Sequence, residues 1–312
     1  MNDYGHELSF GTFIAPESRW ARDVVELARV SERAGLDLVT FMDHPYEPAM
    51  LDTWTLLSYM AAATERVHLS GYVLNLPSRH PALLARSAAS LDLLSGGRVE
   101  LGLGPGDTFA LEAAADNGAP RRSAPQAVAA LEEAVEIIRA IWDVDEPENV
   151  THEGEHYHLR GARRGPRPAH QISIWLPAEG PRTRRLVGRR ADGWITGGAW
   201  MSDVDRELAI GNEMVDEAAI EAGREPGEIR RIFDFSGTFA AHGGGLVQGS
   251  PERWAERLTQ LAVEQGVSTF VLIGRDPAAI ERFGAEVVPA VREAVSRDRV
   301  RAARGAQPEA GA

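Results

Sequence analysis

Two residues that could exchange protons follow directly on an apolar run in the segment TFMDHPY, residues 40–46. Asp43 and His44 carry the carboxylate and imidazole groups that enzymes often use as general acids and bases. A strand that ends in a protein core has little need of two titratable groups at its tip. The alternative is a purely structural role, in which Asp43 caps a turn and His44 only packs against its neighbours.

A second candidate is the glycine-rich segment GLGPG, Gly102–Gly106. It is similar to the dinucleotide fingerprint G-x-G-x-x-G but lacks the third glycine at the right offset, and the first strand–helix unit has no such motif. A Rossmann domain is therefore disfavoured. The bare backbone at Gly104 and Gly106 could still let a flat ligand approach closely, although a tight turn would explain the same glycines.

A third candidate is the segment PAEGPRTRR, which predicts a helix that opens at Gly180–Pro181. Free amides at a helix N-terminus can bind phosphate, and Arg182, Arg184 and Arg185 would strengthen such a site. The alternative is that these arginines are only solvated. Glu179, directly before the helix, argues against a doubly charged anion there.

Histidines are densest in the segment HEGEHYH, residues 152–158. His156 and His158 would share one strand face and could ligate a metal ion. Gly154, however, predicts a hairpin turn that faces the two arms differently, in an insertion away from any strand end. We therefore expect no metal site. The lack of cysteine excludes thiolate nucleophiles, and no G-x-S-x-G elbow supports a serine triad.

These candidates lie among segments that alternate between strand and helix patterns. The strand-like runs are continuously apolar, as expected of parallel strands covered on both faces. Helical patterns follow them, such as the stripe of Leu131, Val135 and Ile138. The expected strands are Leu8–Ile14, Leu38–Met42, Val67–Leu74, Val99–Gly104, Ile172–Leu176, Gly193–Ile195, Ile232–Ala240 and Thr269–Ile273. The expected helices are Trp20–Ala34, Thr53–Thr64, Pro81–Leu94, Ala124–Trp142, Pro181–Ala191, Val204–Ala222, Pro251–Gln265 and Pro277–Ser296.

This α/β rhythm predicts a (β/α)₈ TIM barrel, a fold of typically about 250 residues. A doubly wound open sheet is the alternative, because counting strands does not show closure. Residues 144–170 form an insertion after strand 4 with an expected hairpin. We expect one barrel domain over residues 1–297 and a flexible, disordered C-terminal tail over residues 298–312.

In such a barrel the active site lies at the carboxyl ends of the strands. This rule brings four segments to one face, namely DHP, NLPSRHP, GPGDT and PAEGPR, which follow strands two to five. At a strand end in this fold, a functional role of Asp43 and His44 is favoured over turn capping and packing.

The bulk composition limits the partners. With 33 basic and 46 acidic residues the net charge is −13, which disfavours nucleic acid and anionic membrane surfaces. The N-terminus does not have the pattern of a signal peptide, and no apolar run approaches the length of a membrane span. We expect a cytoplasmic protein that acts on a small molecule.

Taken together, four blocks of the chain resemble the bacterial-luciferase-like superfamily of flavin and deazaflavin oxidoreductases. The resemblance covers about residues 8–296, and the order and spacing of the blocks are more specific than any single motif. It implies a (β/α)₈ barrel with its cofactor ring in the barrel mouth and a homodimer. The blocks are LARVSERAGLDLVTFMDHP, AAATERVHLSGYVLNLPSRHPALLARSAASLDLLSGGRVELGLGPG, PRTRRLVGRRADGWIT and GSPERWAERLTQLAVEQGVSTFVL.

Two cofactors divide this superfamily. The Asp43–His44 pair is similar to the branch that transfers hydride between coenzyme F420 and an organic substrate, so F420 is the expected cofactor. The alternative is an FMN-dependent monooxygenase that uses reduced flavin and oxygen, with a possible separate flavin reductase as partner. A non-catalytic barrel, with flavin or without cofactor, is a second alternative, and a zinc hydrolase is a third. The substrate is not identified by the resemblance.

The resemblance also assigns site residues. Asp43 would contact the ring edge, and His44 would serve as the acid/base or contact the substrate. A non-proline cis peptide is expected at Gly71–Tyr72. The expected cofactor contacts are Asp43, Gly71, Tyr72, Asn75, Gly104, Pro105, Gly106, Ala178 and Gly180, and the expected substrate contacts are Phe13, Tyr46 and Trp200. Glu179 departs from the small residues usual before helix five, and the Ala-rich segment after Asp107 would form an unusual lid.

Overall fold

The computed structural model describes residues 3–198, 201–240 and 246–305. Eight parallel strands close into a barrel, because the strand pairings return from β13 to β1 and the gap between β3 and β5 is bridged. The predicted (β/α)₈ fold is confirmed and the open sheet is excluded. The barrel strands are β1 (Ser9–Ile14), β2 (Leu38–Phe41), β3 (His68–Gly71), β5 (Val99–Gly104), β8 (Ile174–Pro177), β9 (Gly193–Gly197), β10 (Arg230–Ser236) and β13 (Val267–Ile273).

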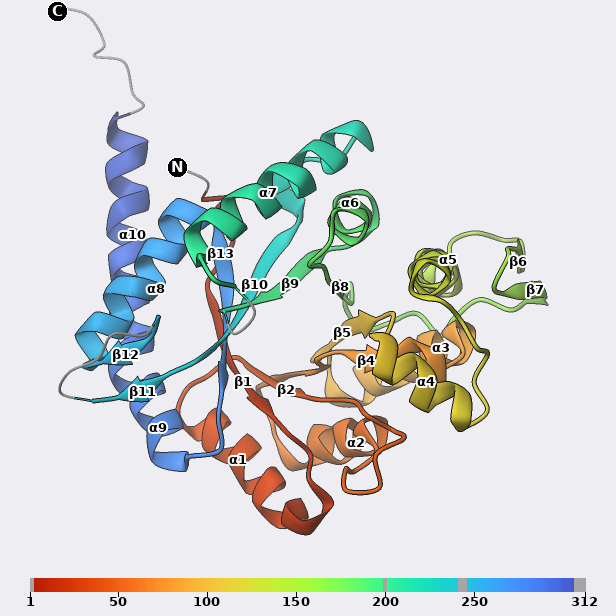
Figure 1. Cartoon of the computed structure of the whole chain (residues 1–312), viewed down its shortest axis with the longest axis horizontal. Coiled ribbons are helices and arrows are strands. Elements are labelled where there is room, and N and C mark those ends of the chain that lie inside the picture. Colours follow the sequence, from red (N-terminus) through yellow and green to blue (C-terminus); the bar gives the residue numbers. More distant parts are fainter. Residues whose placement is uncertain (1–2, 199–200, 241–245, 306–312) are drawn as a thin grey trace, which may run out of the picture.

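Helices connect successive strands and cover the outside of the barrel (Figure 1). No described helix combines the length and apolar character needed to cross a membrane. The helices are α1 (Ala21–Arg33), α2 (Thr53–Ala63), α3 (Pro81–Ser95), α4 (Thr108–Asp116), α5 (Ala124–Trp142), α6 (Pro181–Arg190), α7 (Val204–Glu221), α8 (Pro251–Gln265), α9 (Pro277–Arg282) and α10 (Val288–Gly305). Short turns of helix lie at Ser18–Trp20, Leu76–Ser78, Pro226–Glu228 and Phe283–Val287.

Several helix ends follow from single residues. Asp52 caps α2 by accepting a hydrogen bond from the Thr55 N–H at 2.7 Å. Asp276 caps α9 through the Ala278 N–H at 3.1 Å. Gly266 ends α8 with a φ of 71°, a left-handed conformation that costs glycine little. These local signals fix where the chain turns back toward the next strand.

Two hydrophobic clusters hold the barrel together. The larger one lies between the strands and the surrounding helices. The smaller one takes single residues from different strands, and one from the segment after β3, and therefore fills the barrel interior, as in other barrels of this type. Its buried members are Leu38, Tyr72, Trp175, Ile195, Ile232 and Val271, with Phe13 and Val73 packed against them.

The insertion forms the expected hairpin. Strands β6 (Val150–Glu153) and β7 (His158–Ala162) pair antiparallel, and Figure 1 shows them beyond α5 at the edge of the molecule. Two very short strands, β11 (Thr238–Phe239) and β12 (Gln248–Gly249), pair with each other outside the barrel.

Three details differ from the sequence predictions. The non-proline cis bond joins Tyr72 and Val73, one residue after the predicted Gly71–Tyr72 bond. The segment expected as a lid contains the helix α4, which Asp107 caps through the Ala110 N–H at 2.7 Å. The last helix continues to Gly305, past the predicted end of the domain at residue 297. Arg299 anchors this extension through two hydrogen bonds to the Asp3 carboxylate.

Candidate active site

A cavity of about 460 Å³ opens at the carboxyl ends of the barrel strands. Its wall combines the ends of β1, β8, β9, β10 and β13 with residues at the starts of α6 and α7. Phe13, Val73, Ile195 and Ile273 give it apolar sides. The volume lies within the range of about 300–1,000 Å³ that is usual for small-molecule sites. The location is the one at which barrels of this kind carry their active sites.

One acid projects into this largely apolar space. Asp234, in β10, lines the cavity, and the Tyr72 hydroxyl donates a 3.3 Å hydrogen bond to its Oδ2. Burial raises the pKa of Asp234 to about 6, and the hydrogen bond from Tyr72 acts in the lowering direction. Burial and the neighbouring Asp234 charge raise the pKa of Tyr72, so the phenol stays protonated. Asp234 is thus able to take up or release a proton near neutral pH.

The backbone of β9 makes room for this acid. Gly197 pairs with Asp234 across the sheet, and a side chain at Gly197 would collide with the Asp234 carboxylate. Thr196, beside it, is buried and also contributes to the cavity wall. The glycine is therefore required by the position of the acid rather than by a turn.

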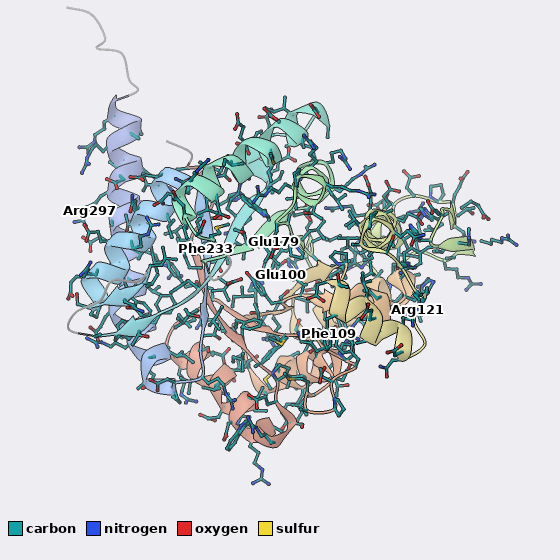
Figure 2. All side chains as sticks on the ribbon, viewed as in Figure 1. Glu100, Phe109, Arg121, Glu179, Phe233 and Arg297 are labelled. Carbon is teal, nitrogen blue, oxygen red and sulfur yellow. The ribbon has the colours of Figure 1, made fainter. Side chains whose placement is uncertain are left out.

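The mouth of the cavity carries one guanidinium and two further carboxylates. Arg184, in the first turns of α6, lies over the Trp194 ring at 5.7 Å, and its buried Nε has no hydrogen-bond partner among the described residues. Burial lowers the pKa of Arg184, while Glu207 and Glu179 act in the raising direction. Figure 2 shows Glu179 just after β8, toward the middle of the molecule.

Asp43 lies in a buried ion pair rather than in the described lining of the cavity. Its side chain is fully buried and accepts two hydrogen bonds from Arg79, from Nε at 3.0 Å and from Nη2 at 2.9 Å. The backbone N–H of Asn75 donates a third, at 2.8 Å. Arg79 also reaches Asp52, the cap of α2, at 3.2 Å. Asp43 thus ties the end of β2 to the segment after β3 and to α2.

His44 lies beside a phenol on the rim. Its Nδ1 is 2.7 Å from the Tyr46 hydroxyl, and the Tyr46 ring packs edge-on against Phe109 of α4. Burial, followed by the charges of Asp107, Glu47 and Asp43, raises the pKa of Tyr46 to about 12. The phenol therefore remains neutral beside the imidazole. Phe109 is 60 % exposed, which leaves an aromatic edge open at this side of the rim (Figure 2).

The glycines expected to lie under a flat ring have other neighbours. A side chain at Gly71 would meet Leu74, and one at Gly104 would meet Val73. A neighbouring side chain of the same chain thus takes up the position that a Cβ would occupy at either glycine. Gly106 has a φ of 80°, so glycine is required there by the turn that leads from Pro105 into α4.

The structure brings together part of the predicted set. Phe13, Tyr72 and Ala178 line the cavity, and Gly180 is the N-cap of α6 beside it. Trp200 lies outside the described residues. The roles assigned to these residues stay predictions, as do those of Asp43, His44, Tyr46, Gly71, Asn75, Gly104, Pro105 and Gly106.

Sequence reasoning missed Asp234, Thr196, Gly197 and Glu207. A signal existed for Asp234, because it is the lone acid in the apolar run RIFDF of a barrel strand. That strand was expected to extend from Ile232 to Ala240, which placed Asp234 near its beginning. In the structure β10 spans Arg230–Ser236, so Asp234 lies at the end that faces the cavity.

Comparison with known proteins gives one consistent family. The model of the luciferase-like monooxygenase family matches residues 8–242. An F420-dependent glucose-6-phosphate dehydrogenase of Intrasporangium calvum is 29% identical over 288 residues, which cover 90% of this chain and 82% of that protein. The enzyme of the same name from Gordonia bronchialis is 32% identical over 234 residues, 73% of this chain and 68% of its own.

Solved structures agree on the fold. An F420-dependent secondary alcohol dehydrogenase in complex with an F420–acetone adduct superposes with a TM-score of 0.79 at 20% identity, over 92% of this chain and 99% of that chain. A long-chain alkane monooxygenase gives a TM-score of 0.75 at 15% identity, over 92% of both chains. At these identities the likeness concerns the barrel architecture.

Proposed function

The chain belongs to the luciferase-like monooxygenase family, and we propose that it is the kind of oxidoreductase in that family that transfers hydride between coenzyme F420 and an organic substrate. The observation that carries the proposal is the position of Asp234, a half-buried acid at the carboxyl end of the barrel, whose pKa burial raises to about 6. Hydride transfer to or from an alcohol or carbonyl carbon needs a partner for one proton, and such an acid is suited to that role. The names of the curated relatives, F420-dependent dehydrogenases, support the choice of cofactor.

The described cavity fits a planar cofactor. Its apolar walls, Phe13, Val73 and Ile273, suit a ring system, and the unpartnered Nε of Arg184 offers a donor among the described residues at the mouth. Ala178 and the N-cap Gly180 lead from the cavity to the first turn of α6, whose free amides suit a singly charged phosphate group of the cofactor better than a doubly charged one, because Glu179 lies beside them. When bound, F420 supplies the carbon that accepts or gives up hydride.

Residues of this chain accept and return the proton that accompanies hydride transfer. In the oxidation direction the hydroxyl proton of the substrate would pass to the Asp234 carboxylate as hydride leaves the substrate carbon. In the reduction direction Asp234 returns that proton to the oxygen of the carbonyl. Tyr72 holds the carboxylate in place through its hydroxyl hydrogen, while Phe13 and Val73 limit water around the reacting atoms. His44 stays proposed as a second acid/base or a substrate contact at the rim.

The substrate that we propose differs from that named for the curated relatives. The described cavity wall carries three carboxylates, Asp234, Glu179 and Glu207, against the single guanidinium of Arg184. A sugar phosphate with about two negative charges would be repelled by such a wall. We therefore propose an uncharged alcohol or carbonyl compound.

Parallel titrations test the cofactor. Purified protein is titrated with oxidised F420 and with FMN, and cofactor fluorescence is followed in both. The proposal expects saturable binding of F420 and much weaker binding of FMN. Tight FMN binding without F420 binding would instead favour the monooxygenase that uses reduced flavin and oxygen. Binding of neither would favour a cofactor-free barrel.

A further inference from the structure

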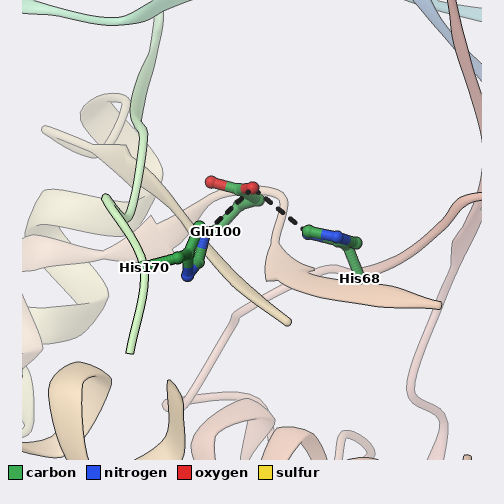
Figure 3. Close-up of side chains that lie close together, drawn as sticks. All are labelled: His68, Glu100 and His170. Carbon is green, nitrogen blue, oxygen red and sulfur yellow. Dashed lines mark hydrogen bonds and ion pairs between the residues drawn. The ribbon is translucent and has the colours of Figure 1, made fainter. Parts of the chain in front are cut away.

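A cluster of two histidines and one glutamate lies at the opposite end of the barrel from the cavity. His68 is the first residue of β3, Glu100 is the second residue of β5, and His170 lies in the segment that leads into β8. Figure 3 shows the Glu100 carboxylate between the two imidazoles, joined to each by a dashed line. The three residues come from separate parts of the sequence, so no local sequence motif indicates the cluster.

The ligand atoms are spaced as a small cation requires. Glu100 Oε1 is 3.2 Å from His68 Nδ1 and 3.5 Å from His170 Nε2. Two ligands on a tetrahedral zinc ion, each at about 2.1 Å, lie about 3.4 Å apart. All three ligand atoms lie within 4.8 Å of one another. A bound ion would draw the ligand nitrogens of His68 and His170 closer together.

A second layer of contacts orients the ligands. Asp92, whose side chain is fully buried, lies 2.9 Å from His170 Nδ1, which turns Nε2 toward Glu100. The Ser173 N–H binds Glu100 Oε2 at 2.9 Å, which leaves Oε1 for the cluster. A carboxylate behind a histidine is the usual support of a metal-ligating imidazole.

The contacts of His170 leave its imidazole able to take an ion. Each ring nitrogen faces a carboxylate, Nδ1 facing Asp92 at 2.9 Å and Nε2 facing Glu100 at 3.5 Å, but neither contact has hydrogen-bond geometry. His68 is 41 % exposed at its side chain, so an ion could enter from solvent. Two nitrogens and one carboxylate oxygen with access to water form a common ligand set of zinc.

We propose that His68, Glu100 and His170 bind one divalent transition-metal ion of the zinc class, with solvent completing its coordination. The ion would link β3, β5 and the segment before β8 at the closed end of the barrel. The site is separate from the cavity and does not depend on the identity of the cofactor.

The competing explanation is an ion-pair cluster without metal. Pairing with Glu100, opposed by burial and assisted by Asp92, raises the pKa of His170 to about 9. A protonated imidazole would then satisfy both carboxylates by itself. The two explanations differ in whether the folded protein takes up a metal ion.

The test uses the full chain without an affinity tag, treated with a chelator and dialysed. Zn²⁺ binding is measured by calorimetry, and Co²⁺ binding by its visible absorption. We expect one ion per chain, tetrahedral or five-coordinate Co²⁺ spectra, and a higher Tm with Zn²⁺, because the ion binds only the folded form. Wild-type protein that binds neither ion at micromolar concentration would overturn the proposal without any variant.

Variants locate the ion. Glu100→Gln and His68→Ala should abolish binding, and Asp92→Asn should weaken it about 10–100-fold. The matched control is His158→Ala, because His158 also pairs with one glutamate, Glu153 at 3.3 Å, but lies in the hairpin. Loss of binding in His158→Ala with retention in Glu100→Gln would place the ion elsewhere and contradict the proposal. Circular dichroism of each variant separates loss of the site from loss of the fold.

Discussion

The hydroxyl of Tyr72 lies 3.3 Å from the Oδ2 atom of Asp234, although the two residues are 162 positions apart in the chain. One follows β3 and the other lies in β10, and both line the cavity at the carboxyl end of the barrel. Because the Tyr72 hydroxyl donates a stronger hydrogen bond to a charged carboxylate than to a carboxylic acid, the pair favours the charged form of Asp234 against the effect of burial.

The first prediction concerns Asp234→Asn. If Asp234 accepts the substrate proton, kcat/KM for oxidation should rise with pH through about 6 in the wild type, because the carboxylate is the active form. The asparagine variant should lose this inflection and about 10²–10⁴-fold of its rate. Steady-state kinetics from about pH 5 to about pH 8 measure both.

Tyr72→Phe is the companion variant for this experiment. It removes a hydrogen bond that lowers the pKa of Asp234, so the inflection should move to higher pH. The matched control is Asp116→Asn, an exposed carboxylate on α4. An unchanged pH profile in Asp234→Asn would remove Asp234 from the proton path.

The second prediction concerns Asp43→Asn and protein stability. The substitution removes the buried partner of Arg79 and leaves it only the partly exposed Asp52 at 3.2 Å, and breaking a buried pair typically costs about 3–5 kcal/mol. Urea unfolding should therefore show a large drop in the midpoint. Asp116→Asn breaks an exposed ion pair with Arg121 and should leave the midpoint unchanged. Normal stability with loss of cofactor binding alone would restore the direct ring contact predicted for Asp43.

The third prediction concerns His44→Ala. A role in proton transfer implies a loss of about 10²–10⁴-fold in kcat with only a modest loss of cofactor affinity. Tyr46→Phe removes the hydroxyl that lies 2.7 Å from His44 Nδ1 while keeping the ring packed on Phe109. Near-normal turnover in His44→Ala would leave the imidazole a packing residue and assign the proton to Asp234.

Much of the fold could be predicted from the sequence because its signals are local. The strand Val99–Gly104 and the helices Ala124–Trp142 and Pro251–Gln265 agree with the structure to the residue. Continuous apolar runs and prolines at helix starts carry that information. The helix α4 was missed because its Ala-rich sequence, TFALEAAAD, follows a glycine turn and was taken as a lid.

The site could be predicted only in part, because it depends on contacts across the barrel. The strand-end rule located the face at which the cavity opens, and Phe13, Tyr72 and Ala178 do line that cavity. The rule could not show that Arg79 occupies both oxygens of Asp43, since the partners are 36 residues apart. Likewise, the predicted strand end at Ala240, four residues beyond the observed end at Ser236, was enough to hide the position of Asp234 near the cavity.

The central claim is that the cavity at the barrel mouth is the F420 site. Ile273→Trp places a large side chain at the cavity wall, whereas Ile210→Trp makes the same exchange at a position on α7 that is 39 % exposed. Fluorescence titration with oxidised F420 should show wild-type affinity in Ile210→Trp. Affinity in Ile273→Trp should be at least about tenfold weaker, because the added volume competes with the ring. Equal affinity for F420 in folded Ile273→Trp and in the wild type would contradict the account.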